Sequence, residues 1–249
     1  MSYDIQTSGL LRPRQAAAAT EIGLGLHRYM LAVYRYVACG LAVTGVTAYF
    51  VMYSGFHAAM MELTPPFLLP FAWIFLLAPL ALAMLFWLCI DEMSLLAAEA
   101  TCWTCAALTG FVFECISQVY IGASLAPAFL TAAGTFATMS ICSYMTGADP
   151  TTPRYFVGVA LIGVVLAGGV NFLLGSTAVE LALSATAILA LVGLAAWDTP
   201  RLKAMYLDSD DGRTINRKAL VGAFALYLDA NPIVLLLRLE SLYGSKPGE

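Results

Sequence analysis

The amino-acid sequence predicts an all-α membrane protein, a polytopic bundle of seven transmembrane helices. Hydrophobic residues make up 61% of the 249 residues and charged residues only 11%, whereas about 25% of the residues in soluble domains are charged. The apolar residues also gather into runs of about 20 residues, the length that a helix needs to cross a bilayer. One membrane domain therefore fits the chain better than one or two soluble domains.

Seven apolar runs follow one another along the chain. Residues 1–28 precede them as a predicted cytoplasmic N-terminal arm, which carries Arg12, Arg14 and Glu21 and lacks the apolar core of a cleavable signal. A short tail, residues 240–249, follows the seven-span domain predicted at residues 29–239. The predicted spans are residues 29–53, 67–90, 95–116, 123–146, 155–175, 177–197 and 219–239.

The basic residues predict the orientation of these spans. Nine of the twelve Lys and Arg residues lie before the first span, at Arg154, and between Arg201 and Lys218. With seven spans, these three segments fall on one side of the membrane, and the opposite loops near 54–66, 117–122 and 175–177 contain no Lys or Arg. Because cytoplasmic loops carry the excess of basic residues, we expect the N-terminus in the cytoplasm and the C-terminus outside.

Two aspartates are the candidate functional residues. Asp229 lies within the seventh apolar run, and Asp198 closes the sixth. An ionisable side chain in hydrocarbon costs at least a few kcal/mol, so its presence indicates a functional site. Two carboxylates that share a poorly solvated site cannot both ionise cheaply and titrate as a unit. The pair is therefore a candidate proton sensor, and its ionised oxygens would suit calcium.

The other polar residues of the spans have simpler interpretations. We expect Glu114 and Glu180 to be interfacial carboxylates and Asn171 to hydrogen-bond a neighbouring helix, because an unpaired amide is costly in lipid. Cys102 and Cys105 have the spacing of a redox motif, but no thioredoxin-like βαβ pattern surrounds them. We interpret them as small buried residues of a helix.

Several other function classes do not fit the sequence. No basic patch interleaved with aromatic residues indicates nucleic-acid binding, and no Gly-x-x-x-x-Gly-Lys loop indicates nucleotide-driven pumping. An intramembrane aspartyl protease also needs two aspartates, but Trp197-Asp198 and Leu228-Asp229 lack its Tyr-Asp and Gly-x-Gly-Asp. A rhomboid-like protease needs Gly-x-Ser-Gly, and Gly122-Ala123-Ser124-Leu125 lacks the second glycine. We expect no enzyme activity and no cofactor.

An ordered set of motifs resembles the transmembrane Bax inhibitor motif (Bax inhibitor-1) family along nearly the whole chain. The strongest pieces are Trp197-Asp198-Thr199 and, some thirty residues later, Leu226-Tyr227-Leu228-Asp229 with a Leu-Leu-Leu-Arg tail. Weaker pieces match the first, third, fourth and fifth spans in order: Gly40 to Gly45, Leu108-Thr109-Gly110, Ala128 to Phe136, and Asn171. The chain looks like a bacterial inner-membrane member, related to a modulator of a membrane protease.

The resemblance implies a seven-helix bundle with the last helix central. It also implies a pH-sensitive calcium leak channel in which Asp198 and Asp229 form the sensor, with calcium as the permeant ion and the lipid bilayer as surroundings. The polar residues that would support the sensor are Asn171, Tyr227, Asn231 and Arg238. The alternative is a non-transporting regulator that binds a membrane protease or another membrane complex.

Three features depart from the family pattern. Asp229 is followed by Ala230-Asn231-Pro232 instead of Phe-Ile-Asn, and Pro232 is expected to kink the last helix. Pro200, two residues after Asp198, is expected to bend or end the sixth helix. Residues 67–90 contain no basic residue, although some members pair the aspartate of the sixth helix with an arginine in the second span.

Overall fold

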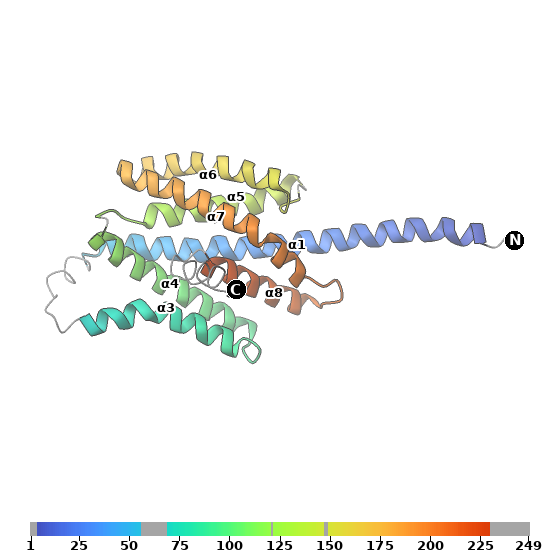
Figure 1. Ribbon diagram of the computed structural model, residues 1–249, viewed down its shortest axis with the longest axis horizontal. Coiled ribbons are helices and arrows are strands. Elements are labelled where there is room, and N and C mark those ends of the chain that lie inside the picture. Colours follow the sequence, from blue (N-terminus) through green and yellow to red (C-terminus); the bar gives the residue numbers. More distant parts are fainter. Residues whose placement is uncertain (1–3, 56–68, 121, 147–148, 230–249) are drawn as a thin grey trace, which may run out of the picture.

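The structure is a computed structural model that describes residues 4–55, 69–120, 122–146 and 149–229. These residues form helices joined by short loops, and no strand occurs among them. Figure 1 labels the helices, whose bounds are α1 Asp4–Tyr53, α3 Leu69–Cys89, α4 Leu95–Tyr120, α5 Ala126–Thr146, α6 Pro153–Leu173, α7 Ala178–Met205 and α8 Gly212–Asp229.

A helix occurs at each of the seven predicted runs. Five segments are long and apolar enough to cross a membrane, and they belong to α1, α4, α5, α6 and α7. In α3 the described side chains form a shorter apolar stretch, Leu77–Cys89, and the predicted seventh run extends past the described residues at Asp229. The chain is thus a polytopic helical membrane protein.

Three helices extend beyond the predicted spans by seven residues or more, and one of them is α8, which begins at Gly212 instead of residue 219. No break separates the predicted arm, residues 1–28, from the first span, because α1 runs without interruption from Asp4 to Tyr53. α7 ends at Met205, eight residues later than predicted, and it continues through Pro200. Of the two expected effects of Pro200, a bend or an end of the helix, the end was therefore wrong.

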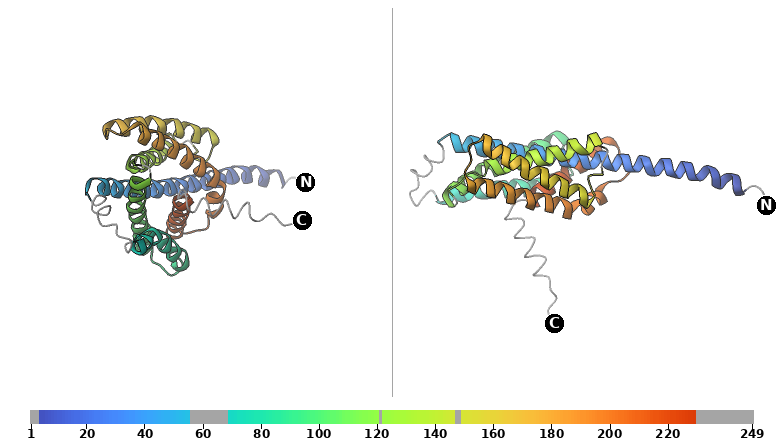
Figure 2. Two further views of the ribbon diagram at one scale, coloured as in Figure 1. Left: turned by 60° about the vertical axis from the view of Figure 1, so that its left-hand side comes forward. Right: turned by 90° about the horizontal axis from the view of Figure 1, so that it is seen from above.

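α1 runs between two groups of helices. Figure 1 shows α5, α6 and α7 on one side of it and α3, α4 and α8 on the other, and the N-terminal part of α1 projects beyond both groups in the views of Figures 1 and 2. α1 contacts α4, α5, α7 and α8, whereas α6 packs only on α5 and α7 among the closely packed pairs of described helices. α1 is accordingly the helix through which the two groups are joined.

Small residues allow the helices to approach one another closely. A Cβ atom added at Gly110 of α4 would overlap the backbone carbonyl oxygen of Thr44 in α1. At Gly163 of α6 it would come within 2.6 Å of Ile188 on α7 and 2.8 Å of Thr135 on α5. Such contacts replace the hydrophobic driving force that helices lack in lipid.

The outer surface of α6 is apolar. Val157, Leu161, Val165 and Phe172 are all more than 60% exposed, and their spacing of four or seven residues places them on one helix face. A stripe of this kind would be a liability in water. It is the surface expected of a helix that faces lipid tails.

The two ends of the bundle differ in composition. The loops between α4 and α5 and between α6 and α7 lie at one end, here called the α6–α7 end. The loops between α5 and α6 and between α7 and α8 lie at the other, here called the α7–α8 end (Figure 1). Arg154 and the basic residues from Arg201 to Lys218 belong to the α7–α8 end.

Candidate functional site

The two candidate aspartates lie on neighbouring helices and are both buried. Asp198 is in α7 and 4% exposed, and Asp229 is the last described residue of α8 and 7% exposed. Both line one cavity of about 230 Å³. The remaining lining residues come from α3, α7 and α8 and are Trp87, Arg201, Leu202, Met205, Val221, Ala225 and Leu226.

A cation also reaches this cavity. Arg201 Nη1 lies 4.0 Å from Asp229 Oδ2, and the side chains of the two residues are 57% and 10% exposed. Arg201 follows Asp198 by three residues, a spacing that places two side chains on the same helix face. The sequence analysis did not predict this pair, because the family pattern places the arginine in the second span. The Asp-x-x-Arg spacing in α7 could have indicated that Arg201 lies on the same helix face as Asp198.

Hydrogen bonds beside Asp198 tie α7 to α1. Thr199 Oγ1 donates to the carbonyl oxygen of Ala195 at 2.7 Å and lies 3.5 Å from the hydroxyl of Tyr34, which is fully buried in α1. The same hydroxyl donates to the carbonyl oxygen of Pro150 at 3.4 Å. Asp198 is thus next to a residue that joins α7, α1 and the loop between α5 and α6.

Tyr227, predicted as a supporting residue, points away from the cavity and towards α1. Its hydroxyl lies 2.7 Å from Thr44 Oγ1, which also donates to the carbonyl oxygen of Ala106 in α4 at 3.1 Å. Tyr227 therefore links α8 to α1 and α4. Its position fixes the helix that carries Asp229 without contact with the cavity.

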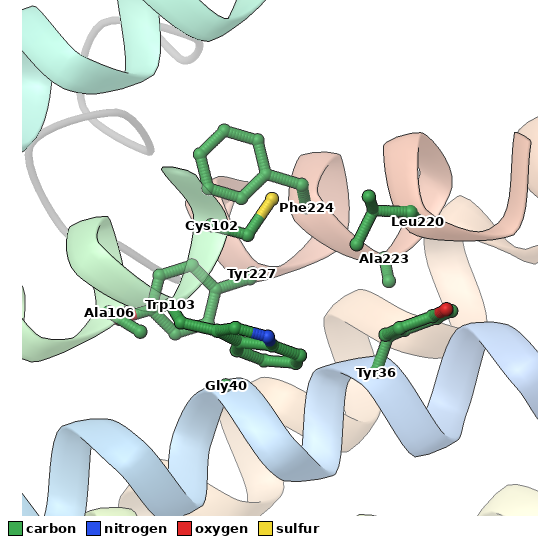
Figure 3. A pocket seen from close by; sticks show the side chains of 9 residues that line it. All are labelled: Tyr36, Gly40, Cys102, Trp103, Ala106, Leu220, Ala223, Phe224 and Tyr227. Carbon is green, nitrogen blue, oxygen red and sulfur yellow. The ribbon is translucent and has the colours of Figure 1, made fainter. Parts of the chain in front are cut away.

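A second, smaller cavity beside Tyr227 does not have the features of a ligand site. Its volume is about 20 Å³, room for about one water molecule. Figure 3 shows that its wall consists mainly of aromatic and small apolar side chains, from Tyr36, Gly40, Cys102, Trp103, Ala106, Leu220, Ala223, Phe224 and Tyr227. The hydroxyl of Tyr36 already donates to Glu99 Oε1 at 2.8 Å.

Asn171, another predicted supporting residue, is not at the cavity. Asn171 of α6 donates to Ser184 Oγ of α7 at 3.1 Å, which confirms the expected bond to a neighbouring helix. Ser184 precedes Asp198 by 14 residues, or roughly 21 Å along α7 at 1.5 Å per residue. Asn231, Arg238 and the expected kink at Pro232 lie outside the described residues.

Glu114 and Glu180 are not interfacial, contrary to the expectation from the sequence. Glu114 is fully buried and Glu180 is 7% exposed. Both accept hydrogen bonds from Ser124, in the loop before α5: its hydroxyl donates to Glu114 Oε2 at 3.0 Å and its amide donates to Glu180 Oε1 at 2.9 Å. The sequence could not reveal this arrangement because the three residues come from separate segments that only the fold brings together.

The cysteines and the acidic residues form no metal centre in the part of the chain that the structure describes. No group of three or more His, Cys, Asp or Glu residues there could hold a metal ion. Cys102 and Cys105 are buried free thiols in α4. Cys105 Sγ lies 3.4 Å from the carbonyl oxygen of Pro79 in α3, so that this thiol serves in helix packing.

The fold and the buried pair define a polytopic helical membrane protein with a cavity lined by two buried carboxylates. The family model described as "Inhibitor of apoptosis-promoting Bax1" matches residues 26–246. The chain therefore belongs to the Bax inhibitor family, as its motifs predicted.

Bacterial relatives match nearly the full length of the chain. The inner membrane protein YbhL of Escherichia coli K12 is 35% identical over 227 residues, which cover 89% of this chain and 93% of the relative. The uncharacterized protein RP147 of Rickettsia prowazekii is 34% identical over 226 residues, 89% of this chain and 91% of the relative. A Caulobacter vibrioides protein is 31% identical over 240 residues, with coverage of 91% and 92%. No solved structure matches the chain.

Proposed function

We propose that the protein is a pH-sensitive calcium leak channel of the Bax inhibitor-1 type, gated by Asp198 and Asp229. The observation that carries the proposal is the cavity of about 230 Å³ lined by both carboxylates, which come from different helices. Carboxylate oxygens are preferred ligands of calcium, and buried acids inside a membrane mark ion or proton pathways. The family membership supports the same assignment.

Arg201 gives the proposed gate a specific chemistry. Its guanidinium lies 4.0 Å from Asp229, so a calcium ion that binds Asp229 must compete with it for the same oxygens. A nearby cation favours the ionised form of a carboxyl group. Raising the pH removes the remaining protons from the pair, increases its negative charge and strengthens the attraction for calcium, so flux is expected to rise with pH.

The proposal includes the arrangement in the membrane. We place the protein in the bacterial inner membrane, as the name of the Escherichia coli relative indicates for that protein, with seven spans and the last helix central. Arg154 and the Arg201–Lys218 segment share the α7–α8 end, which favours a cytoplasmic position for that end. The N-terminus is then cytoplasmic and the C-terminus outside. We propose no catalytic activity for the aspartates and no nucleic-acid partner.

Flux measurements with purified protein in liposomes test the proposal. We expect passive calcium flux that rises as the pH increases between about 5 and 9, and loss of most of this pH dependence in Asp198→Asn and in Asp229→Asn. Arg201→Gln should raise the calcium flux at a given pH, because the guanidinium that competes with calcium for the oxygens of Asp229 is removed. Asp91→Asn, which changes an exposed aspartate of the α3–α4 loop, is the matched control and should behave as the wild type.

The alternative is a regulator that binds a membrane protease or another membrane complex without transporting ions. Folded wild-type protein that gives no calcium flux at any pH in this range would reject the channel and favour the regulator. Flux that is unchanged in both aspartate variants would instead keep the channel and reject the proposed gate.

A further inference from the structure

Two buried carboxylates hold the N-terminal end of α7. Ser124 joins them, because its hydroxyl donates a hydrogen bond to Glu114 of α4 and its backbone amide donates one to Glu180 of α7. The amide of Leu125 also donates to Glu114 Oε2, at 3.1 Å. The loop that leads into α5 is therefore hydrogen-bonded to two helices that are far from each other in sequence.

The second oxygen of Glu180 fixes the start of its own helix. Glu180 Oε2 accepts hydrogen bonds from the amide of Thr177 at 2.7 Å and from its hydroxyl at 3.2 Å, and the Thr177 hydroxyl in turn accepts from the Glu180 amide. This reciprocal arrangement is a capping box. One turn later, Ser184 accepts the hydrogen bond from Asn171 of α6. The same end of α7 is thus tied to α4, α6 and the start of α5.

The geometry requires a carboxylate at position 180. The backbone amides of Ser124 and Thr177 can only donate, and they approach different oxygens of Glu180. An ionised carboxylate offers two acceptor oxygens, whereas the amide of glutamine offers one oxygen and one NH₂ group. Glutamine has nearly the same shape but would direct N–H groups at one of these two amides, in either orientation.

The loops at this end are also shaped by glycine. Gly122, two residues before Ser124, has φ +66°, and Gly175, two residues before Thr177, has φ +64°. Positive φ is readily accessible only to glycine. Both connections therefore turn tightly and bring Ser124 and Thr177 to the carboxylates.

The other end of α7 has a different environment. Asp198 follows Glu180 by 18 residues, roughly 27 Å along the helix axis, and there α7 borders the cavity of about 230 Å³. Pro200 has no N–H to donate to the carbonyl oxygen four residues earlier, which weakens the helix at this point. α7 is thus held by two buried carboxylates at one end, whereas at the other end it contacts Tyr34 of α1 through Thr199 and borders the cavity.

We infer that Glu114, Ser124 and Glu180 are positioning residues, which fix the N-terminal end of α7 and thereby set where Asp198 and Arg201 stand relative to Asp229. The hydrogen bonds that join Glu114, Ser124 and Glu180 act on the cavity through the length of α7, since none of these three residues lines the cavity. The consequence for gating rests on the proposed function, but the fixed N-terminal end of α7 does not.

Hydrogen–deuterium exchange on the full-length protein in lipid nanodiscs, without calcium, tests this inference. Asp198→Asn should change amide exchange at residues 198–205 and leave residues 122–126 and 177–182 as in the wild type. Glu180→Gln should raise exchange at 122–126 and 177–182 by about tenfold or more, because hydrogen bonds to a charged group are lost, and it should also raise exchange at 198–205. Exchange at 198–205 that stays at the wild-type level in Glu180→Gln would overturn the inference.

Two further variants make the test specific. Glu99→Gln is the matched control, since Glu99 of α4 accepts a hydrogen bond from the Tyr36 hydroxyl, which the oxygen of glutamine can also accept; exchange at all three segments should stay unchanged. Ser124→Ala removes the hydroxyl bond to Glu114 and the bond that this hydroxyl accepts from the Ala126 amide, but it keeps the amide bond to Glu180. If Glu180→Gln does not fold, this milder change should raise exchange at 177–182 and 198–205 to a smaller extent. Unchanged exchange in folded Ser124→Ala would then overturn the inference. If the exchange pattern is as expected but calcium flux is absent, the positioning role of Glu114, Ser124 and Glu180 is supported and the proposed leak channel is rejected.

Discussion

One helical turn of α7 brings charges of both signs to the cavity. Asp198 and Arg201 lie on the same face of the helix, and Arg201 pairs with Asp229 of α8 at 4.0 Å. The arginine side chain is more than half exposed, so solvent screening leaves the pair little weight in stability. Its importance is the positive field that it applies to a nearly buried carboxyl group. At this scale the site is a set of three ionisable side chains, Asp198, Arg201 and Asp229, that line one cavity.

Asp211 provides a residue-scale prediction outside the membrane. The residue precedes α8, and its carboxylate accepts a hydrogen bond from the amide of Thr214 at 3.0 Å. Hydrogen bonds from Thr214 are the main cause that lowers the pKa of Asp211 below its ordinary value. A lowered pKa stabilises the folded state above the unfolded value of about 3.9, and this contribution is lost as the pH falls through the folded value.

Thermal unfolding in detergent at several pH values measures this contribution. Asp211→Ala should lower the melting temperature at pH 7, and the difference from the wild type should shrink as the pH falls below about 4. The control is Asp91→Ala, an exposed loop aspartate, with a difference that should be near zero throughout. A deficit of Asp211→Ala that persists unchanged at low pH would mean that the ionised side chain does not cap α8.

At the scale of elements, α7 carries stabilising residues at both of its ends. Thr177 and Glu180 form the capping box at its start, and Lys203 lies in its last turn, where a cation interacts favourably with the helix dipole. The helix continues through Pro200 because its flanking turns remain bonded, as the Thr199 bond to Ala195 illustrates. Proline thus weakens the helix beside Asp198 without ending it.

Gly110 gives a prediction about helix packing. Gly110→Ala should destabilise the protein by about 1–3 kcal/mol, the usual cost of overpacking, because the new Cβ would overlap the carbonyl oxygen of Thr44 and neither backbone can easily move. Unfolding in detergent with denaturant measures the change. The matched control is Gly168→Ala in α6, where a Cβ meets nothing within 4 Å; it should be neutral or stabilising by up to about 1 kcal/mol. Equal effects of the two substitutions would argue against the close contact between α1 and α4.

At the scale of the whole molecule, α1 joins the two groups of helices. It contacts α5 and α7 on one side and α4 and α8 on the other. The last helix also lies among several neighbours, because α8 contacts α1, α4 and α7 and its Phe224 ring lies 4.4 Å from that of Phe86 in α3. A shift of α8 or α7 would therefore reach most of the bundle.

The orientation of the bundle is a prediction at this scale. Fusions of alkaline phosphatase and of a cytoplasmic fluorescent reporter report the side of the membrane. A fusion after residue 249 should be active with phosphatase and dark with the fluorescent reporter, whereas a fusion after residue 208, in the α7–α8 loop, should show the reverse, because basic loops stay in the cytoplasm. A fluorescent fusion after residue 249 would require an even number of spans and reject the proposed seven.

The sequence by itself determined the class of protein, the helices and the family. Apolar runs of bilayer length specify membrane helices because the backbone must satisfy its own hydrogen bonds in lipid, and the motifs around Asp198 and Asp229 were sufficient to predict the family. The positions of Arg201, Glu114 and Glu180 were not predicted from the sequence. Whether a polar side chain in an apolar run is interfacial or buried depends on which other helices face it. Capping residues and loop glycines also bring Ser124 to Glu114 and Glu180, but they do so only after the helices have packed. Only the tertiary structure decided these positions, because they arise from contacts between segments that are distant in the chain.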